Sequence, residues 1–431
     1  MSKVVSLQCL RCGTHYTPDY RGLGCEACTG ELASNLRVQY DADDVRAWAF
    51  NTGEHRRIGG LWQFADMLPV DRDCAVSLGE GGTPLVATER LAAYLGIENL
   101  YVKDETRNPT QSYKDRVSTV AVSYAKQLGA PVVATASSGN AGASLAAYAA
   151  RAGMPCVVVS MKGAAGPMMT QIRKLGAHLI MMADKSQRWP LLAAGVRRHN
   201  WFVTSPYSAP VVGSTPIGIE GYKTIAYEIV QDLGRAPDWM AMPVCYGDAL
   251  SGIYQGFMDL KSAGVIQSIP RFVAAEAHGS LKQALDNGSD TVPAATVKYD
   301  ALAASVGAAQ SAFQALYALR QSNGVAVPVN NDGLVEMQEQ IASQEGLLLE
   351  LASVMPFIAV RRLREAGLIS AKELVVCLAT GSGLKDVDKS TAAWSDIPVT
   401  TLGIDEILEA TVEALHRRSS EVRVATLESV Q

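Results

Sequence analysis

The sequence lacks any run of about 18 consecutive apolar residues, the length that a membrane-spanning helix needs. Its first residues, Met-Ser-Lys-Val-Val, lack the apolar core and cleavage site of a secretory signal peptide. A formal net charge of −5 leaves no excess of basic residues for a general nucleic-acid-binding surface. We therefore expect a cytoplasmic protein with neither a nucleic-acid nor a membrane partner.

The chain is also poor in histidine and has no internal repeats. His55, His178, His199 and His416 stand in no arrangement that suggests a metal site or a catalytic triad. His15 could replace a cysteine as a metal ligand, and His278 could face a pocket, although a satisfied or exposed histidine is the alternative there. The absence of repeats excludes a solenoid. A hydrophobic content of 48% in 431 residues is enough for two buried cores and a small additional unit.

Four of the eight cysteines form two CxxC pairs near the N-terminus, at Cys9, Cys12, Cys25 and Cys28. Two thiolate pairs separated by a short glycine-containing loop can supply the four ligands of a closed tetrahedral Zn²⁺ site. A closed site has no open coordination position, so the pattern predicts a structural metal, with a disulfide pair as the alternative. The other four cysteines lie in apolar runs and are interpreted as core residues, although Cys245 borders a polar loop.

Residues 108–116 read Asn-Pro-Thr-Gln-Ser-Tyr-Lys-Asp-Arg and place Lys114 at a polar bend. The apolar spacing of residues 117–128 predicts a helix directly after this bend. The positive end of the helix dipole disfavours a charged lysine, so we expect a lowered pKa for Lys114. Schiff-base chemistry requires such an amine. A solvated surface lysine is the alternative when the segment is taken alone.

Three polar loops follow predicted buried strands. Residues 135–142 read Thr-Ala-Ser-Ser-Gly-Asn-Ala-Gly, residues 243–252 read Pro-Val-Cys-Tyr-Gly-Asp-Ala-Leu-Ser-Gly, and residues 379–383 read Ala-Thr-Gly-Ser-Gly. Open α/β sheets bind ligands at the carboxyl ends of their strands. Free N–H groups at a helix start suit a carboxylate or a phosphate. These loops therefore predict a ligand site, with the Thr380 hydroxyl at a strand exit.

With these segments in this order, the chain resembles the fold-type II pyridoxal-phosphate enzymes, and within them the threonine synthase family. Further matches are Ser-Leu-Gly-Glu-Gly-Gly-Thr-Pro-Leu at 77–85, Tyr-Val-Lys-Asp-Glu at 101–105 and Glu-Gly-Tyr-Lys-Thr at 220–224. The resemblance covers residues from about 78 to 386. It implies an α/β fold with two three-layer α/β/α domains, and an N-terminal zinc ribbon is found in some members.

The resemblance also implies roles for single residues. Lys114 would form the internal aldimine with pyridoxal 5′-phosphate (PLP) and then act as acid and base. Asn140 would hydrogen-bond the ring hydroxyl, and Thr380 would meet the pyridine nitrogen. A hydroxyl partner leaves that nitrogen unprotonated, which suits elimination and replacement at the β or γ carbon. The cofactor phosphate would be bound by Gly247, Asp248, Ala249, Leu250, Ser251 and Gly252. The amino-acid substrate would be bound by Thr110, Ser112, Ser137, Ser138, Gly139, Ala141 and Thr215.

The expected domains are a zinc ribbon (1–45), a large PLP-binding domain (46–110 and 226–390), a small mobile domain inserted in it (111–225) and a C-terminal helical extension (391–431). The bulky Trp48, Trp62 and Phe64 are interpreted as packing residues, and residues 301–319 as an alanine-rich helix. Apolar spacing over 405–415 predicts an amphipathic helix for packing or dimer contact. A homodimer is the expected assembly.

Several positions depart from the family pattern. Threonine synthases usually have Asn-Pro-x-Arg before Glu-Gly-x-Lys-Thr, and the arginine clamps the substrate phosphate, but Gly218 stands there in this chain. Loss of a bidentate arginine should weaken phosphohomoserine binding by several kcal/mol. Asp248 would repel a phosphate unless its carboxylate points away or binds through a cation. The usual Thr-Gly-Ser-Phe-Lys reads Thr-Gln-Ser-Tyr-Lys at 110–114.

These departures leave several functions open. The first is threonine synthase activity, which converts O-phosphohomoserine and water into threonine and phosphate. A β-replacement such as that of cysteate synthase, with phosphoserine and sulfite, and a serine or threonine dehydratase are the nearest alternatives. A non-catalytic homologue that binds an amino acid or a partner is an alternative of another class.

Overall fold

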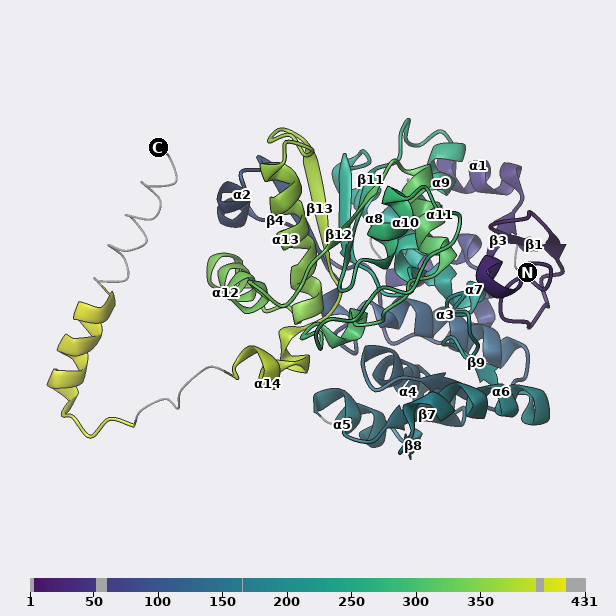
Figure 1. Cartoon of the computed structure of the whole chain (residues 1–431), viewed down its shortest axis with the longest axis horizontal. Helices are drawn as coiled ribbons and strands as arrows, with labels where there is room; N and C mark the ends of the chain where they lie inside the picture. Colours follow the sequence, from purple (N-terminus) through teal and green to yellow (C-terminus); the bar gives the residue numbers. More distant parts are fainter. Residues whose placement is uncertain (1–3, 52–59, 165, 393–398, 416–431) are drawn as a thin grey trace. The chain divides into compact units, whose positions relative to one another are not determined.

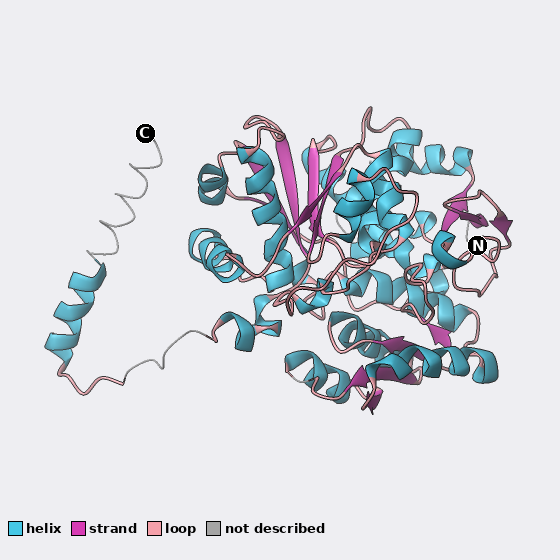
Figure 2. Ribbon diagram, viewed as in Figure 1, coloured by secondary structure: helices cyan, strands magenta, loops and turns pink. Residues whose placement is uncertain are grey.

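The computed structural model describes residues 4–51, 60–164, 166–392 and 399–415 (Figure 1). The chain divides into two compact units, Met1–Val387 and Asp388–Gln431. Helices and strands alternate along most of the first unit (Figure 2). Among the described helices, none is both long and apolar enough to cross a membrane.

A six-stranded sheet forms the larger part of the first unit. Its strand order is β12 (Val325–Pro328), β11 (Arg271–Glu276), β10 (Trp239–Pro243), β13 (Leu374–Ala379), β5 (Asn99–Asp104) and β4 (Leu85–Ala87). All neighbours pair in parallel except β4 with β5. Parallel sheets are covered by helices on both faces, which explains why the central strands are apolar along their whole length.

Alternate residues of the central strands enter two different hydrophobic cores. In β10, Met240 and Met242 pack with α8 (Lys223–Leu233), α9 (Asp248–Ser262), α10 (Ser280–Asp286) and α11 (Phe313–Gln321). Trp239 and Ala241 pack on the other face with α2 (Glu89–Leu95), α12 (Leu334–Glu345) and α13 (Leu351–Glu365). The predicted α/β/α layering is confirmed.

A second, four-stranded parallel sheet has the order β8 (His178–Met182), β7 (Cys156–Met161), β6 (Val133–Ala136) and β9 (Phe202–Val203). On one face lie α3 (Lys114–Gln127), α4 (Asn140–Ala152) and α5 (Pro167–Lys174), and on the other lies α6 (Arg188–His199). Helix α3 supplies residues to three cores, through Val117, Val120 and Val122. The helix that begins at Lys114 is therefore shared by both parallel sheets.

The N-terminal segment forms a three-stranded antiparallel sheet with the order β2 (His15–Tyr16), β1 (Val4–Cys9) and β3 (Leu36–Tyr40). Trp48 of α1 (Ala42–Asn51), Trp62 and Phe64 are buried, so their interpretation as packing residues is confirmed. The finer division of the first unit into ribbon, large and small domains stays a prediction.

One predicted helix is wrong over most of its length. Residues 301–312 contain only the short turn Ala304–Val306, and α11 begins at Phe313. Ala303 and Val306 are buried in this irregular segment, so tertiary packing outweighs the helix propensity of alanine there. Helix α14 spans Val387–Ser390, and in the second unit residues 404–415 are helical, as predicted for 405–415. Residues 416–431 of the expected extension lie outside the described residues.

Candidate active site

Helix α3 is held by a buried cluster of charges two residues beyond Lys114. The Arg116 guanidinium lies 2.6 Å from Glu105 and 2.7 Å from Glu228, and Lys103 lies 2.8 Å from the same Glu228 carboxylate. Arg116, Glu105 and Lys103 have no exposed surface. Removing one partner of such a network leaves a buried charge uncompensated, so this cluster fixes the start of α3 firmly.

The segment before Lys114 is tied to the end of strand β13. The Tyr113 N–H donates to the carbonyl of Thr380 at 2.9 Å, and Ser112 forms an antiparallel bridge with Gly381. Gln111 reaches this position with φ +60°, a left-handed conformation that favours glycine. The glutamine that replaces the usual glycine of this motif therefore adopts a strained backbone conformation beside the lysine.

Two tyrosines surround the Lys114 amine. Its Nζ lies 4.6 Å from the ring centre of Tyr113 and 5.8 Å from that of Tyr222, and the two rings stack with centroids 5.2 Å apart. Burial lowers the pKa of Lys114, but Tyr113, Tyr222 and the carboxylate of Asp248 together raise it by more. The pKa of Lys114 therefore lies well above its ordinary value. The predicted lowering is wrong, because these groups raise the pKa by more than burial lowers it. Lys114 must therefore lose a proton before it can attack an aldehyde.

The hydroxyl of Thr380 is oriented by Ser353. Ser353 Oγ accepts hydrogen bonds from the N–H groups of Thr380 (2.9 Å) and Gly381 (3.0 Å), so its lone pairs are occupied. Its own proton therefore points to Thr380 Oγ1, 2.8 Å away. Thr380 is left as a donor, with Glu350 Oε1 as an acceptor at 3.1 Å. A hydroxyl that must donate fits an unprotonated pyridine nitrogen.

Asn140 lies opposite Thr380 on the same carboxylate. Its Nδ2 donates to Glu350 Oε2 at 2.8 Å, while its buried Oδ1 has no hydrogen-bond partner among the described residues. Such an orphaned acceptor suits the ring hydroxyl of a ligand. Burial raises the pKa of Glu350, whereas Asn140, Lys385, Thr380 and Lys114 lower it less. Glu350 therefore takes up a proton more readily than an exposed glutamate.

The loop before α9 has the form of a phosphate-binding site. Gly247 caps the helix with φ +81°, and a Cβ there would collide with Ala315. Ala249 and Leu250 bury their side chains in the core, so this turn offers its first free backbone N–H groups to a ligand. Asp248, Ser251 and Gly252 complete the first turn.

The carboxylate of Asp248 is hydrogen-bonded by residues outside this turn. Ser214 donates to it through its N–H (2.9 Å) and its hydroxyl (2.6 Å), and Gln314 Nε2 donates at 2.6 Å. These three neutral donors occupy most of the four acceptor positions of the carboxylate and hold it in place. The expected repulsion between Asp248 and a phosphate stays a prediction.

Residues 137–139 precede α4 and are half-buried. The Gly139 N–H donates to Ser137 Oγ at 3.2 Å, and Ser138, Gly139 and Ala141 line the start of the helix. The hydroxyl of Thr110 donates to Asp115 at 2.5 Å. The roles of these residues in substrate binding stay predictions.

Two further predicted substrate-binding residues are buried. Ser112 Oγ has no hydrogen-bond partner among the described residues, so it is free to bind a ligand. Thr215 caps the short helix α7 (Pro216–Ile219). If Gly218 carried a side chain, its Cβ would lie 3.2 Å from the methyl carbon of Thr215.

Gly218 has no room for a side chain. A Cβ there would lie 2.8 Å from Val117 Cγ2 and 3.3 Å from Ala121 Cβ, because α7 packs directly on α3. The absence of an arginine at this position is therefore built into the packing of the two helices. Within the described residues, nothing else on α7 supplies a cation, since it reads Pro-Ile-Gly-Ile.

Asp115 provides a test of the electrostatics next to Lys114. Burial raises the pKa of Asp115 to about 6, although hydrogen bonds from Thr110 and Ser144 lower it. An acid with a raised pKa in the folded state loses its contribution to stability as pH rises from about 4 to about 6. We expect the free energy of unfolding to fall by on the order of 3 kcal/mol over this window in the wild type relative to Asp115→Asn.

Urea denaturation of both proteins at several pH values measures this difference. Asp184→Asn is the matched control, because hydrogen bonds from Ser186 lower the pKa of this exposed aspartate. The stability contribution of Asp184 is present above the unfolded-state pKa and is lost as the pH falls, so the control should show the opposite trend. Parallel pH profiles for wild type and Asp115→Asn would contradict the assignment.

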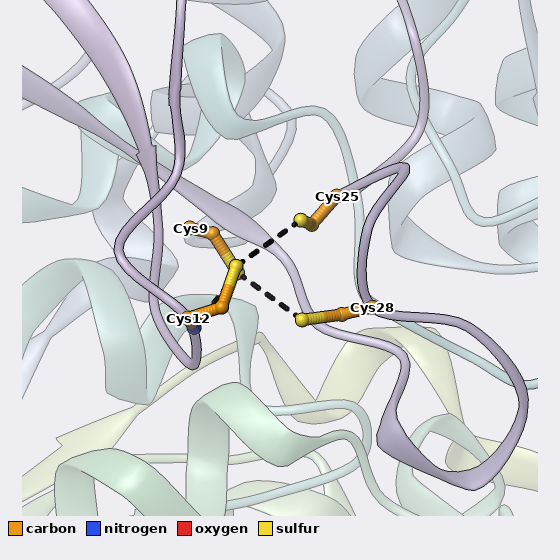
Figure 3. A group of neighbouring side chains, drawn as sticks. All are labelled: Cys9, Cys12, Cys25 and Cys28. Carbon is orange, nitrogen blue, oxygen red and sulfur yellow. Dashed lines mark hydrogen bonds between the residues drawn. The ribbon is translucent and has the colours of Figure 1, made fainter.

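The four N-terminal cysteines converge on one point (Figure 3). The sulfur of Cys9 lies 3.8 Å from that of Cys28, and the sulfur of Cys12 lies 3.6 Å from that of Cys25. A tetrahedral site with Zn–S bonds of about 2.3 Å has sulfurs about 3.8 Å apart. All four cysteines are free thiols in the structure, which does not support the alternative of a disulfide pair. The cysteines fit a structural Zn²⁺.

Comparison with known proteins identifies the chain. The model of the family described as pyridoxal-phosphate dependent enzyme matches residues 76–381. A threonine synthase of Methanocaldococcus jannaschii is 34% identical over 398 residues, which cover 91% of this chain and 95% of that protein. The chain belongs to the threonine synthase family of PLP-dependent enzymes. A second threonine synthase, of Methanosarcina acetivorans, is 33% identical over 94% of this chain and 98% of its own.

Solved structures agree on the fold of this PLP enzyme. A threonine deaminase isoform of Solanum lycopersicum aligns over 86% of this chain and 96% of its own, with a TM-score of 0.63 and 17% identity. Maize serine racemase aligns over 78% of this chain and 93% of its own, with a TM-score of 0.59 and 17% identity. At these identities the likeness concerns the fold alone.

Sequence reasoning missed several groups that shape the site of this PLP enzyme. Ser353, which orients Thr380, lies one turn into α13 in an otherwise apolar run. Tyr222 stood in the Glu-Gly-Tyr-Lys-Thr motif, but its contact with Lys114 joins positions far apart in sequence. Ser214 and Gln314, the partners of Asp248, had no local signal at all. Cys245 needs no special role, since burial raises the pKa of its thiol to about 11.

Proposed function

We propose that this enzyme uses PLP held by Lys114 to eliminate or replace a substituent at the β or γ carbon of a small L-amino acid. Bound PLP supplies an electron-accepting ring that stabilises negative charge at the substrate's α-carbon. Asn140 and Thr380 would hold opposite edges of that ring, and the free N–H groups at the start of α9, within Gly247–Gly252, would hold its phosphate. The 137–141 loop would bind the substrate carboxylate.

The observation that carries this proposal is the hydrogen bond between Tyr113 and Thr380. It joins the residue before Lys114 to the exit of β13, so the lysine that starts α3 lies next to the segment that carries the Thr380 hydroxyl. Lys114 would act as the base that removes the α-proton and as the acid that returns it. Glu350, with its raised pKa, lies within hydrogen-bonding distance of both ring-binding groups.

The first substrate to consider is O-phosphohomoserine with water, because both curated relatives cited above are threonine synthases. The packing at Gly218 favours a second candidate. Without a cation on α7, a phosphate monoester on the substrate loses a charged partner. A β-replacement like that of cysteate synthase, or dehydration of serine or threonine, is therefore the alternative on the same frame.

A substrate screen of the PLP-loaded enzyme separates these candidates. O-phosphohomoserine, O-phosphoserine, serine and threonine would each be added with and without sulfite, and visible absorbance, phosphate and 2-oxo acid would be followed. Phosphate release from O-phosphohomoserine alone supports threonine synthase activity. Turnover of a three-carbon substrate alone supports the second candidate. A protein that binds amino acids but turns none over would instead be a non-catalytic homologue.

Removal of the metal should affect stability rather than the reaction. We expect a chelator to lower the melting temperature, because four thiolates then lose the ion that closes the ribbon. With PLP present in saturating amount, turnover should persist, since no cysteine of the ribbon belongs to the proposed PLP site. Calorimetry and an activity assay on the same samples check both parts. A melting temperature that is independent of zinc would contradict the structural role of the metal.

The location and assembly are also proposals. Reduced cysteines at a zinc site support a cytoplasmic location. A homodimer is supported by the family resemblance and by exposed apolar residues on the helix at 404–415, among them Leu408 and Leu415. Light scattering after size-exclusion chromatography measures the assembly, and a monomer at micromolar concentration would contradict it.

A further inference from the structure

A closed ring of hydrogen bonds joins the zinc ribbon to the proposed phosphate loop. Asn35 Nδ2 donates to Gln314 Oε1 (2.9 Å) and to the carbonyl of Ser214 (3.1 Å). Gln314 and Ser214 both donate to the carboxylate of Asp248. The ring therefore runs from Asn35 through two intermediaries to the residue that follows Gly247.

The direction of each bond in this ring is fixed. Asn35 Oδ1 accepts from the Leu36 N–H at 2.9 Å, and Gln314 Nε2 also donates to the carbonyl of Tyr246 at 3.0 Å. Turning over either amide would place oxygen against oxygen, so the two amides form a relay with a single polarity. Asn35 and Gln314 are at most 1% exposed, which leaves no water to substitute for a lost partner.

The ribbon end of this relay, Asn35, is held by the first CxxC segment, Cys9–Cys12. Leu10, between Cys9 and Cys12, donates its N–H to the carbonyl of Asn35 at 3.2 Å. The neighbouring Arg11 guanidinium lies 3.7 Å from the ring centre of Phe313, next to Gln314. The segment Cys9–Cys12, which would bind the metal, thus contacts Asn35 directly and Phe313, the residue before Gln314.

The side chains of this ring have no free space into which they could move. Gly213, with φ +119°, passes so close that a Cβ would collide with Gln314 and would lie 2.8 Å from both Asn35 and Asp248. A displaced amide cannot move into this gap without shifting the backbone. A change at Asn35 is therefore transmitted to Asp248 rather than absorbed locally.

We propose that Asn35 is a positioning residue for the cofactor and that metal binding in the ribbon tightens PLP binding through Gln314 and Asp248. The relay supplies hydrogen-bond donors to the Asp248 carboxylate beside the proposed phosphate site, and without them this negative charge at the first position of α9 would be uncompensated. This inference rests on the proposed PLP site at Gly247–Gly252. By thermodynamic linkage, PLP must tighten metal binding by the same factor.

The first test is the isosteric change Asn35→Asp. The introduced carboxylate would face two acceptors, so Gln314 would turn its amide and present an oxygen to Asp248. We expect the dissociation constant of PLP, measured by titrating PLP-free protein in the visible range, to rise about tenfold. Phosphorus NMR of bound PLP should shift as well, which a purely structural change far from the phosphate would not cause.

A matched control and a second variant keep the test decisive. Asn99→Asp makes the same chemical change at an exposed residue whose Nδ2 also donates to a carbonyl, that of Lys372. It should leave PLP affinity unchanged. Gln314→Glu interrupts the relay from α11 and leaves every residue of the ribbon unchanged, so it tests the link if Asn35→Asp does not fold. Circular dichroism and zinc content establish folding in each case.

A thermodynamic cycle, in which zinc is removed from the wild type and from Gln314→Glu, tests the coupling between metal and PLP binding. Stripping zinc from the wild type should raise the PLP dissociation constant by about the same factor, and returning zinc should restore it. In Gln314→Glu, zinc should have little further effect on PLP binding. Folded variants that bind PLP like the wild type would overturn the coupling alone. A wild type that binds no PLP would overturn the proposed function as well.

Discussion

Lys114→Ala is expected to abolish turnover and the visible absorbance of lysine-bound PLP, while the fold is retained. In our proposal the Lys114 amine both attaches the cofactor covalently and moves the α-proton, so its loss removes both roles at once. We expect turnover to fall by at least about four orders of magnitude, as happens when one of several catalytic groups that act together is removed. Absorbance spectra, turnover and circular dichroism of the purified variant measure the three parts of this result.

Lys126→Ala is the matched control, because Lys126 lies in the last turn of the same helix and is exposed. This variant should retain both absorbance and activity. Unchanged turnover in Lys114→Ala would show that the reaction does not pass through this amine, and the assignment of the active site would fail.

Gly218→Arg should destabilise the protein and should not create phosphohomoserine activity. Even a methyl group at this position would press on Val117, one turn from Lys114, and overpacking of this kind costs about 1–3 kcal/mol. An arginine adds a buried charge without a partner, so we expect a loss above about 3 kcal/mol in the free energy of unfolding. Denaturant titration measures the stability, and phosphate release from O-phosphohomoserine measures the activity.

The smaller change Gly218→Ala separates packing from charge. Gly307→Ala is its control, since a Cβ there meets only ordinary contacts at 3.4 Å or more and the position has no positive φ. We expect Gly218→Ala to lose about 1–3 kcal/mol and Gly307→Ala less than about 0.5 kcal/mol. A stable Gly218→Arg enzyme that gains phosphohomoserine turnover would show instead that α7 can move off α3.

The parts of the site that could be predicted were those with local signals. Lys114 was found from a bend and a helical pattern within twenty residues, and the zinc ligands from their spacing. The strands before the three loops were found because parallel strands buried on both faces are continuously apolar. The order of these segments along the chain then supported the family resemblance.

The parts that could not be predicted depend on contacts between distant segments. Asn140 and Glu350 are separated by 210 positions, so no local sequence pattern predicts their hydrogen bond. The pKa of Lys114 was predicted from the helix start alone, and Tyr222 and Asp248, which reverse its direction, come from other elements. The orientation of Asp248 likewise follows from Ser214 and Gln314, which no local pattern distinguishes.

Several family motifs turned out to build the frame rather than the site. Lys103 and Glu105 from one motif, and Thr224 from another, surround Arg116 in the core. Glu80 of the Glu-Gly-Gly-Thr motif accepts from Trp62 and from other buried donors. A motif therefore identified the family reliably without revealing which of its residues meet the ligand.

The ring that joins Asn35 to Gln314 also sets an order of maturation during synthesis. The two residues are 279 positions apart, and ribosomes add about 5–20 residues per second. The cysteines can thus enclose their metal tens of seconds before Gln314 has been made, and Thr380 follows later still. The metal site is then formed first, and the cofactor pocket is assembled last. In a cell short of zinc, newly made chains would reach PLP with that site unformed and would accumulate without cofactor.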